Sequence, residues 1–346
     1  MNFYKEQHKF YCGIDLHARK MYLCILDEKG EVKLHRNMDT DREIFLKAIE
    51  PYREDVVVAV ECMFTWYWIA DLCQREGISF VLGHALYMKA IHGGKAKNDK
   101  IDSQKIAVLL RGGMIPMSYV YPEKMRATRD LMRRRNHLMR KRAELLAHIQ
   151  NTNSQYNLDE TFGCIAVPSK RGDIVGSFDH PAVKKSVEAD LKVITVYDAT
   201  LHDLEKTILK LAQYHDPVSY ALLDSVYGIG KIGALTILYE IEDIRRFPRV
   251  QDFVSYARLV KCEKTSAGKS YGTSGNKIGN AHLKRAFSEA ALLFLRGNEP
   301  AKKWFEKLTR KHGKGKALSI LAHKLGRAVY FMLKNKEAFD EKRFLR

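Results

Sequence analysis

The chain has 346 residues, more than one compact core usually holds, so two or three domains are expected. It carries 59 Lys and Arg against 41 Asp and Glu, and the formal charge of +18 favours a polyanionic partner, most often nucleic acid, over a surface that is basic only for solubility. There is no run of about 18 apolar residues, no signal-peptide-like apolar region and no CxxC pair among the 6 cysteines, which argues against a membrane span, secretion and a zinc site, and favours a cytoplasmic protein with reduced cysteines.

The first part of the chain alternates between strand and helix patterns. Apolar runs at 10–16 and 20–28, with a turn signal at Asp27-Glu-Lys-Gly30, predict a β-hairpin. The next segments predict a helix that begins near 39–43, a strand at 56–60, a helix at 65–76, a strand at 79–82 and a helix at 102–111. This order fits an α/β domain with an RNase H-like layout.

Four carboxylates stand where such a fold would place acidic ligands. Asp15 follows the first apolar run, and Glu61 follows the apolar run at 56–60. Asp99 and Asp102 lie three apart where a helix begins, so both can face the same side. A charged group at the end of a buried strand is unusual unless a cation or a reaction needs it. The four acids therefore predict a divalent-metal site for phosphodiester chemistry.

The pair Asp99 and Asp102 also has a purely structural explanation. Acidic residues at the N-cap and in the first turn of a helix are favoured by its unpaired backbone N–H groups and by its dipole. That explanation is sufficient for the pair alone, but it leaves Asp15 and Glu61 unexplained, so the metal site is favoured. Lys97, with other lysines nearby, would steer phosphate towards it.

Residues 124–155 contain no Gly or Pro and predict one long helix. Between positions 124 and 142 this segment carries 9 basic residues and only 1 acidic residue, Asp130. A solvated helix usually mixes both signs and gains i, i+4 pairs, so a track along a phosphate backbone is favoured over a plain surface. The nucleic-acid-binding residues predicted on this helix are Arg126, Arg133 and Arg134.

An irregular connector is predicted at 156–186, where glycine and proline recur. A heptad pattern follows over 187–215, and its apolar positions are Ile194, Tyr197, Leu201, Leu204, Ile208 and Leu211. Because this seam is short, a coiled coil between chains and packing within one chain are equally good explanations.

The last part, 216–346, predicts an all-helical domain. Gly228-Ile-Gly230 lies between apolar helices and resembles a helix-hairpin-helix, in which a glycine turn lets the next helix offer its first N–H groups to a DNA phosphate. An ordinary helix–helix turn is the alternative. Residues 296–346 hold 15 Lys and Arg against 5 Asp and Glu, and Lys314 and Lys316 lie in a predicted flexible basic loop at 311–316 suited to phosphate contact.

A second polar segment, 264–286, is rich in Ser, Gly and Lys and predicts a flexible basic loop between helices. Its Ala267-Gly-Lys-Ser270 ends like a P-loop, but the upstream glycine of that motif is missing, so nucleotide binding is rejected. Lys264, Lys269 and Lys277 are predicted to contact nucleic acid. A serine in this loop is a poor nucleophile unless a base or a positive field assists it.

The order and spacing of these motifs are specific. Towards the N-terminus they are Gly13-Ile-Asp15, Val60-Glu61 with Thr65, and Lys97-Asn-Asp99 with Asp102. Towards the C-terminus they are Val226-x-Gly-Ile-Gly230, Phe253 with Tyr256-Ala257, Ser266-x-Gly268, and Lys277-x-Gly279-Asn280 with Leu283, Arg285 and Ala286. Over nearly its whole length, the chain resembles the DEDD transposases of the IS110 insertion-sequence family, which include the Piv-type DNA invertases.

This resemblance implies a RuvC-like domain at 1–155, in which Asp15, Glu61, Asp99 and Asp102 bind Mg²⁺ or Mn²⁺, and a C-terminal domain that supplies a catalytic serine. The serine would form a covalent phosphoserine link to DNA, with acids and serine contributed by different subunits. The implied partners are double-stranded DNA of the element ends and target, a bridge RNA, and further copies of the chain in a dimer or a synaptic tetramer. The expected location is the nucleoid of a bacterium or archaeon.

The resemblance implies Ser266 as the nucleophile, and Ser270 and Thr265 stay open because the Ser-rich loop can shift by about a residue in alignment. Two other functions are weighed. A hydrolytic RuvC-type nuclease, such as a junction resolvase, would use the four acids and water, but it leaves Ser266 and the C-terminal domain without a role. A non-catalytic nucleic-acid-binding protein would have a decayed site, whereas the four acids are complete.

Overall fold

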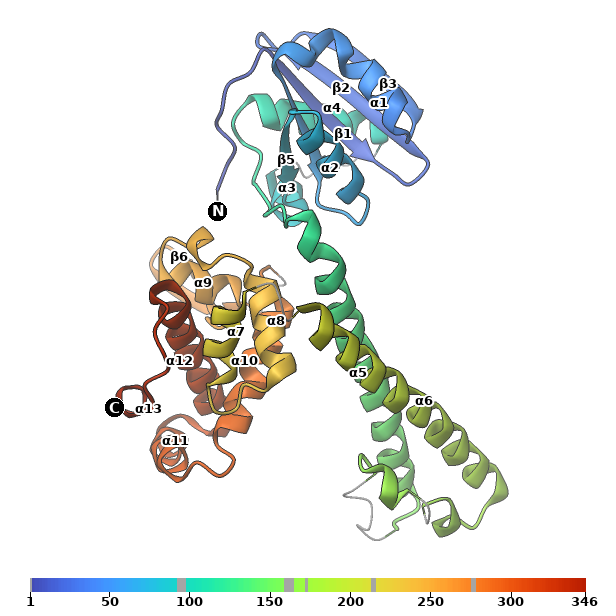
Figure 1. Ribbon diagram of the computed structural model, residues 1–346, viewed down its shortest axis with the longest axis vertical. Coiled ribbons are helices and arrows are strands. Elements are labelled where there is room, and N and C mark those ends of the chain that lie inside the picture. The colour runs from blue at the N-terminus through green and yellow to red at the C-terminus, as the bar shows by residue number, and fades with distance from the viewer. Residues whose placement is uncertain (1, 92–97, 159–164, 172–173, 213–215, 275–277) are drawn as a thin grey trace. The chain divides into compact units, whose positions relative to one another are not determined.

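The computed structural model describes residues 2–91, 98–158, 165–171, 174–212, 216–274 and 278–346. The chain forms two compact units, Met1–Lys124 and Met125–Arg346, coloured from blue to green and from green to red in Figure 1. Among the described residues, every helix is too short or too polar to span a lipid bilayer.

The first unit is built on a five-stranded sheet in the order β3-β2-β1-β4-β5. The antiparallel part consists of β1 (Phe10–Leu16), β2 (Lys20–Asp27) and β3 (Val32–Asp39). The parallel part adds β4 (Val56–Glu61) beside β1, and β5 (Ser79–Gly83) beside β4. The predicted hairpin and the predicted strands at 56–60 and 79–82 are confirmed, as is an α/β N-terminal region followed by a largely helical one.

The strand β3 is missing from the sequence-based prediction. It lies at the edge of the sheet, and among its residues only Met38 is buried. An edge strand with this much solvent exposure has little need of apolar residues, so its sequence carries a weak strand signal. Its place is decided by backbone pairing with β2.

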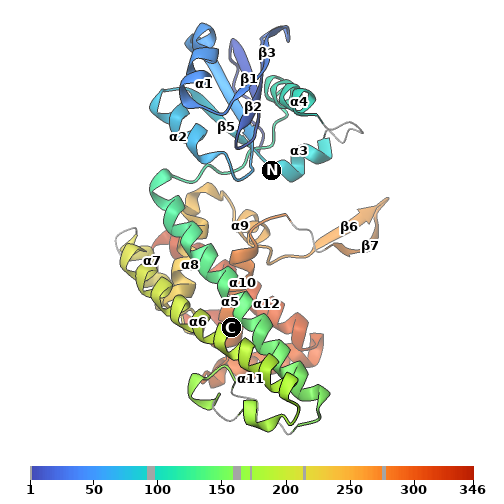
Figure 2. The same ribbon diagram turned by 90° about the vertical axis from the view of Figure 1, so that its right-hand side faces the viewer.

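Helices cover both faces of this sheet (Figure 2). α1 (Arg42–Ile49) and α2 (Tyr67–Arg75) pack on the face that carries Ile14 and Val60, with a 3-10 turn at Glu50–Asp55 between α1 and β4. α3 (Ala85–Ile91) and α4 (Asp99–Arg111) cover the face that carries Tyr11, Val57 and Ala59. Because side chains alternate along a strand, Asp15 and Glu61 continue the α4 face.

Gly13 sets how closely α4 lies on β1. A Cβ atom at Gly13 would lie 2.3 Å from Ala107 N and 2.4 Å from Ser103 O, which are backbone atoms of α4. Neither atom can move without displacing the helix, so only glycine permits this approach. This contact holds the first half of α4 against β1. Gly13 lies two residues before Asp15, so the helix is fixed close to that acid.

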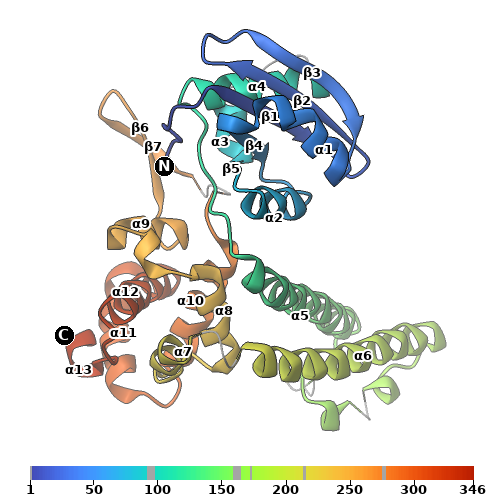
Figure 3. The same ribbon diagram turned by 45° about the horizontal axis from the view of Figure 1, so that its top comes forward.

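The second unit begins with two long helices, α5 (Glu123–Gln155) and α6 (Pro181–Ala212), which run side by side (Figure 3). They are antiparallel, because ion pairs join Arg135 to Glu205 and, further along α5, Arg142 to Asp198. The seam residues Ile194, Leu201 and Ile208 are buried. The heptad pattern thus serves packing within the chain, and a coiled coil between chains stays a prediction.

Part of the predicted connector packs against α5 and α6. It contains 3-10 turns at Pro168–Lys170 and Val175–Ser177, and Ile165, Ile174 and Phe178 form a cluster with residues of α5 and α6. α6 already begins at Pro181, inside the range 156–186. The predicted domain limits, which assign 124–155 to the first domain, stay a prediction; in the structure, α5 from Met125 onward packs with the second unit.

The rest of the second unit is a helical core. Large buried side chains such as Phe253, Phe287, Phe294 and Tyr330 fill it. Its helices are α7 (Pro217–Asp224), α8 (Lys231–Ile241), α9 (Val250–Tyr256), α10 (Ala281–Phe294), α11 (Glu299–His312), α12 (Lys314–Asn335) and α13 (Glu341–Phe344), with a 3-10 turn at Ile244–Arg246.

The prediction that this region is all-helical, with a flexible loop in the Ser/Gly/Lys segment, is wrong in one place. Two antiparallel strands, β6 (Cys262–Ser266) and β7 (Lys269–Ser274), form a hairpin that extends from the helices of the second unit (Figures 2 and 3). Ala267 and Gly268 join them with φ of 49° and 74°. A two-residue turn with positive φ matches the twist of paired strands, so the polar sequence closes a hairpin here.

Gly228 has a packing role in the turn between α7 and α8. Its φ is 89°, and an added Cβ would lie 2.5 Å from Phe294 N in α10. Gly230 caps the start of α8, and nothing lies within 4 Å of the place its Cβ would take. Close approach to α10 therefore explains Gly228, while a helix-hairpin-helix that binds DNA phosphate stays a prediction for this turn.

The predicted flexible basic loop at 311–316 is also wrong. α11 ends at His312 and α12 begins at Lys314, so Gly313 alone, with a φ of 76°, separates the two helices. Glycine adopts this positive φ without strain, so it can end one helix and redirect the chain into the next. Lys314 and Lys316 consequently lie exposed on the first turn of α12.

The contact at Gly13 leads to a stability prediction. Gly13→Ala should lower the free energy of unfolding by about 3 kcal/mol, because the new methyl group collides with the backbone of α4. Urea unfolding followed by tryptophan fluorescence measures this change. Gly176→Ala is the control, since open space surrounds Gly176, and it should change stability by less than about 0.5 kcal/mol. Equal stability of the two variants would contradict the prediction.

Candidate functional site

Two of the predicted acids lie at the carboxyl ends of neighbouring parallel strands. β1 and β4 are in register from Phe10 with Val56 to Ile14 with Val60, so Asp15 and Glu61 are the next residues of the two strands. Both side chains are half-buried. Strand ends beside one another form a rigid platform for groups that act on the same atom.

The other two acids lie on the first turn of α4. Asn98 is the N-cap, and its side chain accepts a hydrogen bond from Lys100 N, so neither Asp99 nor Asp102 fills that position. Asp102 accepts a hydrogen bond from Lys105 Nζ at 3.2 Å and is half-buried. Asp99 is 59% exposed. Capping therefore does not account for Asp99, although both acids still benefit from the helix dipole.

His17 is not among the site residues predicted from the sequence. Its side chain lies near both an acid of β1 and an acid of α4. Its Nε2 lies 3.4 Å from Asp15 Oδ2 and 3.8 Å from Asp99 Oδ1. One ligand atom from each of Asp15, His17 and Asp99 lies within 4.8 Å of the others. One feature of the sequence could have pointed to His17: it lies two residues after Asp15, in the turn between β1 and β2.

Asp15 is the most perturbed of these acids. Burial raises its pKa above the ordinary value, His17 opposes this shift, and the negative charges of Asp99 and Asp102 add to it. A half-buried carboxylate that faces two others is ionised at some cost unless a cation compensates it. The site therefore favours a bound cation.

The donor set fits a divalent metal ion. Carboxylate oxygens suit Mg²⁺ and Mn²⁺, and an imidazole nitrogen is a ligand that Mn²⁺ also accepts. Asp15 and Asp99 come from a strand and a helix that Gly13 holds in close contact, so their spacing does not depend on a loop. In the described residues, this is the one group of at least three such side chains close enough to share an ion.

The predicted nucleophile lies in the second unit, at the tip of the β6–β7 hairpin. Ser266 pairs with Lys269 across the two-residue turn, and Thr265 pairs with Ser270. Residues directly opposite in an antiparallel pair point to the same side, and neighbours along a strand point to opposite sides. Ser266 and Lys269 thus share one side of the hairpin, while Ser270 and Thr265 share the other.

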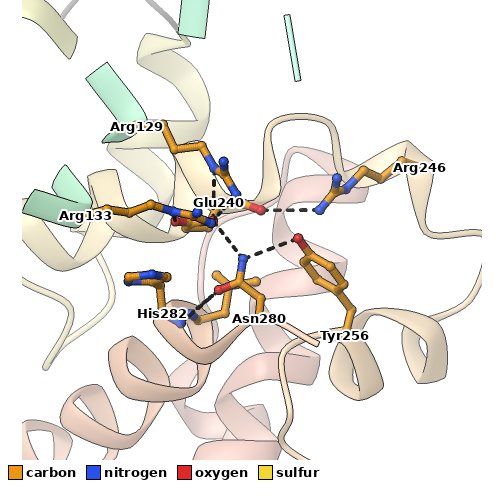
Figure 4. A network of polar contacts seen from close by, with 8 residues as sticks. Arg129, Arg133, Glu240, Arg246, Tyr256, Asn280 and His282 are labelled. Carbon is orange, nitrogen blue, oxygen red and sulfur yellow. Dashed lines mark hydrogen bonds and ion pairs between the residues drawn. The ribbon is translucent and has the colours of Figure 1, made fainter. Parts of the chain in front are cut away.

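Several arginines of the basic face predicted on the long helix pair with acids of the same chain, and the track along a phosphate backbone stays a prediction. Glu240 on α8 is 2% exposed and accepts hydrogen bonds from Arg129 at 2.8 Å and from Arg133 at 2.7 Å (Figure 4). Arg126 is also buried. The sequence shows these basic residues, but it does not show that acids of α6 and α8 pair with them, because those acids are distant along the chain.

Glu240 also anchors the segment that follows the hairpin. Its Oε2 accepts a hydrogen bond from Asn280 Nδ2 at 2.8 Å, and Asn280 Oδ1 caps α10 by accepting from His282 N and Leu283 N (Figure 4). Burial by itself would raise the pKa of Glu240, but the hydrogen bond from Arg133 and the charge of Arg129 lower it to about 2. A single ionised carboxylate thus joins α5, α8 and α10.

The remaining predicted contacts to nucleic acid fall into two groups. Arg134, Lys269, Lys314 and Lys316 are exposed and stay predictions. Lys97 and Lys277 lie outside the described residues, and Lys264 is described only as part of β6.

Comparisons with known proteins find transposases along most of the chain. A family model of DEDD type from IS110, described as a transposase, matches residues 12–158, and the model described as the transposase IS116/IS110/IS902 family matches residues 220–306. The transposase for insertion sequence element IS1111A of Coxiella burnetii is 22% identical over 334 residues, which cover 94% of this chain and 90% of that protein. The y4qE protein of Sinorhizobium fredii, named as a candidate transposase, is 23% identical over 301 residues, covering 83% and 72%.

The Glu240 network predicts a pH-dependent stability difference. Glu240→Gln should lower the free energy of unfolding by about 3 kcal/mol at pH 7, because folding lowers the pKa of Glu240 from 4.5 to about 2. Since the folded pKa is the lower one, this stabilisation is present above pH 4.5 and disappears as the pH falls towards 2. The difference between variant and wild type, measured by urea unfolding across this range, should shrink accordingly.

The control is Glu144→Gln, which removes an exposed acid that pairs with Lys141 on the same α5. It should change stability little at any pH, because exposed ion pairs contribute little. A constant difference between Glu240→Gln and wild type from neutral to acidic pH would contradict the role given to Glu240.

Proposed function

We propose that this chain, which belongs to the IS110 family of DEDD transposases, cuts and rejoins DNA through a covalent phosphoserine intermediate with the help of Mg²⁺ or Mn²⁺. The family accounts for DNA as the substrate and for an enzyme that cuts and rejoins it. The serine, the metal identity and the further partners are our proposal.

The observation that carries the proposal is the meeting of separate elements at one edge of the sheet. Asp15 and Glu61 end neighbouring strands, and Asp99 lies near Asp15 with His17 between them. Acids that lie close together repel one another, and this repulsion costs free energy. A divalent ion bound there together with a phosphodiester would offset that cost.

The proposed metal ligands are Asp15, Glu61, Asp99 and Asp102. A divalent ion held there would neutralise the scissile phosphate and stabilise the departing oxygen. The chain's own groups have separate roles: the two strand acids fix the position, and α4 brings the remaining pair. Lys105, which donates to Asp102, would release this acid or keep it oriented as the ion binds.

Ser266 is the proposed nucleophile. Its Oγ attacks the phosphorus and loses its proton to solvent, while the P–O bond to one DNA strand end breaks and the departing strand oxygen takes up a proton from solvent to become a hydroxyl. The phosphoserine bond conserves the energy of the phosphodiester, so a strand hydroxyl can reverse the step and rejoin DNA without an added energy source. Lys269, which pairs with Ser266 on the same side of the hairpin, supports this choice because its positive charge would stabilise the attacking oxygen.

The acids and Ser266 lie in different units of the chain, and the family resemblance suggests that different subunits supply them. We propose that the active assembly is a homo-oligomer and that a bridge RNA pairs donor and target DNA. Separation of the two halves would delay cutting until the synaptic complex forms. The exposed hairpin tip, from Ser266 to Lys269, suits delivery of the serine to a second chain.

A hydrolytic nuclease is the second candidate, because the four acids alone could activate water. It is the weaker one, since it gives no role to the hairpin that presents Ser266. The two candidates differ in one product: only the transposase mechanism leaves protein attached to DNA.

The nucleophile is tested by incubating the protein with element-end DNA, bridge RNA and Mg²⁺ and separating the products under denaturing conditions. Ser266→Ala should abolish the protein–DNA adduct, and Ser270→Ala should retain it, because Ser270 is on the opposite side of the hairpin. Chelation of the metal should abolish cleavage in every variant. Cleavage by the wild type without any adduct would establish the hydrolytic candidate instead.

The composite site is tested by mixing two inactive variants. A subunit with Asp102→Asn keeps its serine, and a subunit with Ser266→Ala keeps its acids, so a mixture should regain part of the cleavage if different subunits combine. Asp102→Asn mixed with the double variant Asp102→Asn, Ser266→Ala is the matched control and should stay inactive. Absence of rescue at every ratio would mean that each chain uses its own acids and serine.

A further inference from the structure

A hollow of about 520 Å³ lies beside the acidic site of the first unit. Its walls include three aromatic side chains, Phe64, Tyr67 and Trp68, together with the polar residues His17, Thr40, Asp41, Arg42 and Thr65. This volume is in the range of ligand-binding clefts. His17 belongs both to the hollow and to the group with Asp15 and Asp99, so the two sites are continuous.

Phe64 is the unusual member of this wall. It is 82% exposed, whereas its neighbour Trp66 is buried in the core between the sheet, α1 and α2. Tyr67 and Trp68 are half-buried and pack against that core. Packing in the core therefore accounts for Trp66, Tyr67 and Trp68. It does not account for Phe64, which is exposed to solvent at the mouth of the hollow.

Both sides of the hollow are fastened to the end of β1. Thr65 Oγ1 donates a hydrogen bond to Leu16 O at 3.0 Å, and Thr40 Oγ1 donates to His17 O at 2.9 Å. Leu16, which lies between Asp15 and His17, is thus tied to Thr65 beside Phe64, and His17 is tied to Thr40 on the other wall. A group bound in the hollow would keep a constant position relative to the acids.

The chemistry of the walls matches a nucleobase. Aromatic side chains stack on the π-face of any base, and such stacking tolerates every sequence. Arg42 is exposed at the rim, where a guanidinium can approach a phosphate. A base within a stacked duplex cannot enter, because its faces are already covered by its neighbours.

We propose that this hollow holds one unpaired nucleobase of the substrate DNA strand, next to the phosphate that lies at Asp15 and Asp99. Phe64 stacks on the base, and Arg42 contacts the adjoining backbone. The site thereby prefers DNA that is already unpaired at the cleavage position, which deepens the proposed function and rests on it. Recognition is of an unpaired base as such, without preference for its identity.

The test measures binding of a short single-stranded oligothymidylate to the full chain by fluorescence anisotropy, with a duplex of the same length in parallel and no divalent metal. Phe64→Ala should weaken single-strand binding about 5- to 150-fold, the loss expected when one stacking side chain is removed, and leave duplex binding unchanged. Phe64→Tyr should restore it. Met63→Ala is the matched control, because Met63 is 51% exposed on the same loop and does not line the hollow, and it should bind as wild type does.

A photocrosslink locates the base directly. A strand with 5-iododeoxyuridine at the position next to the cleaved phosphate should crosslink to Phe64, Tyr67 or Trp68, as mapped by mass spectrometry. Unchanged single-strand binding in Phe64→Ala, or a crosslink only outside the hollow, would overturn the proposal. Neither measurement depends on DNA cleavage. If the protein cleaves no DNA but Phe64→Ala still weakens single-strand binding, only the transposase mechanism is refuted. If the protein cleaves DNA and Phe64→Ala binds single strands as wild type does, only the nucleobase site is refuted.

Discussion

A buried carboxylate, Glu240, holds the second unit together. It receives hydrogen bonds from Arg129 and Arg133 of α5 and from Asn280 at the start of α10, and its own backbone belongs to α8. Removing an ion from water costs several kcal/mol, so this charge is tolerated only because three donors surround it. Arg246 donates to its carbonyl oxygen and stacks on Tyr256, which extends the network towards the base of the hairpin.

This constraint connects structure to the proposed chemistry. Asn280 follows the hairpin of Ser266 and Tyr256 ends the helix before it, and both belong to the network of Glu240, which thus connects the two ends of the segment that carries the serine. In the first unit, Gly13 has the corresponding role. By letting α4 lie on β1, it brings Asp99 and Asp102 close enough to Asp15 for their charges to act on it. Each half of the proposed active site therefore depends on one close contact between elements.

Much of the first unit follows from local patterns. The apolar runs locate β1, β2, β4 and β5, and the acids at their ends are visible as charges that interrupt hydrophobic segments. His17 escapes notice because a histidine in a turn has no distinctive pattern. The edge strand β3 escapes because solvent exposure removes the apolar alternation. Phe64 escapes too, since only a folded structure distinguishes an exposed aromatic residue from a buried one.

The sequence by itself determined the α/β and helical regions, the long helices, the order of the motifs and the four acids, because these depend on periodicity and on residues close along the chain. The tertiary structure decided what the charges do. Arg126 and Arg133 were expected on DNA, but Arg126 is buried and Arg133 faces Glu240, since a partner more than 100 positions away compensates the charge. It also decided that the serine segment is a hairpin, because two positive φ angles let its strands pair.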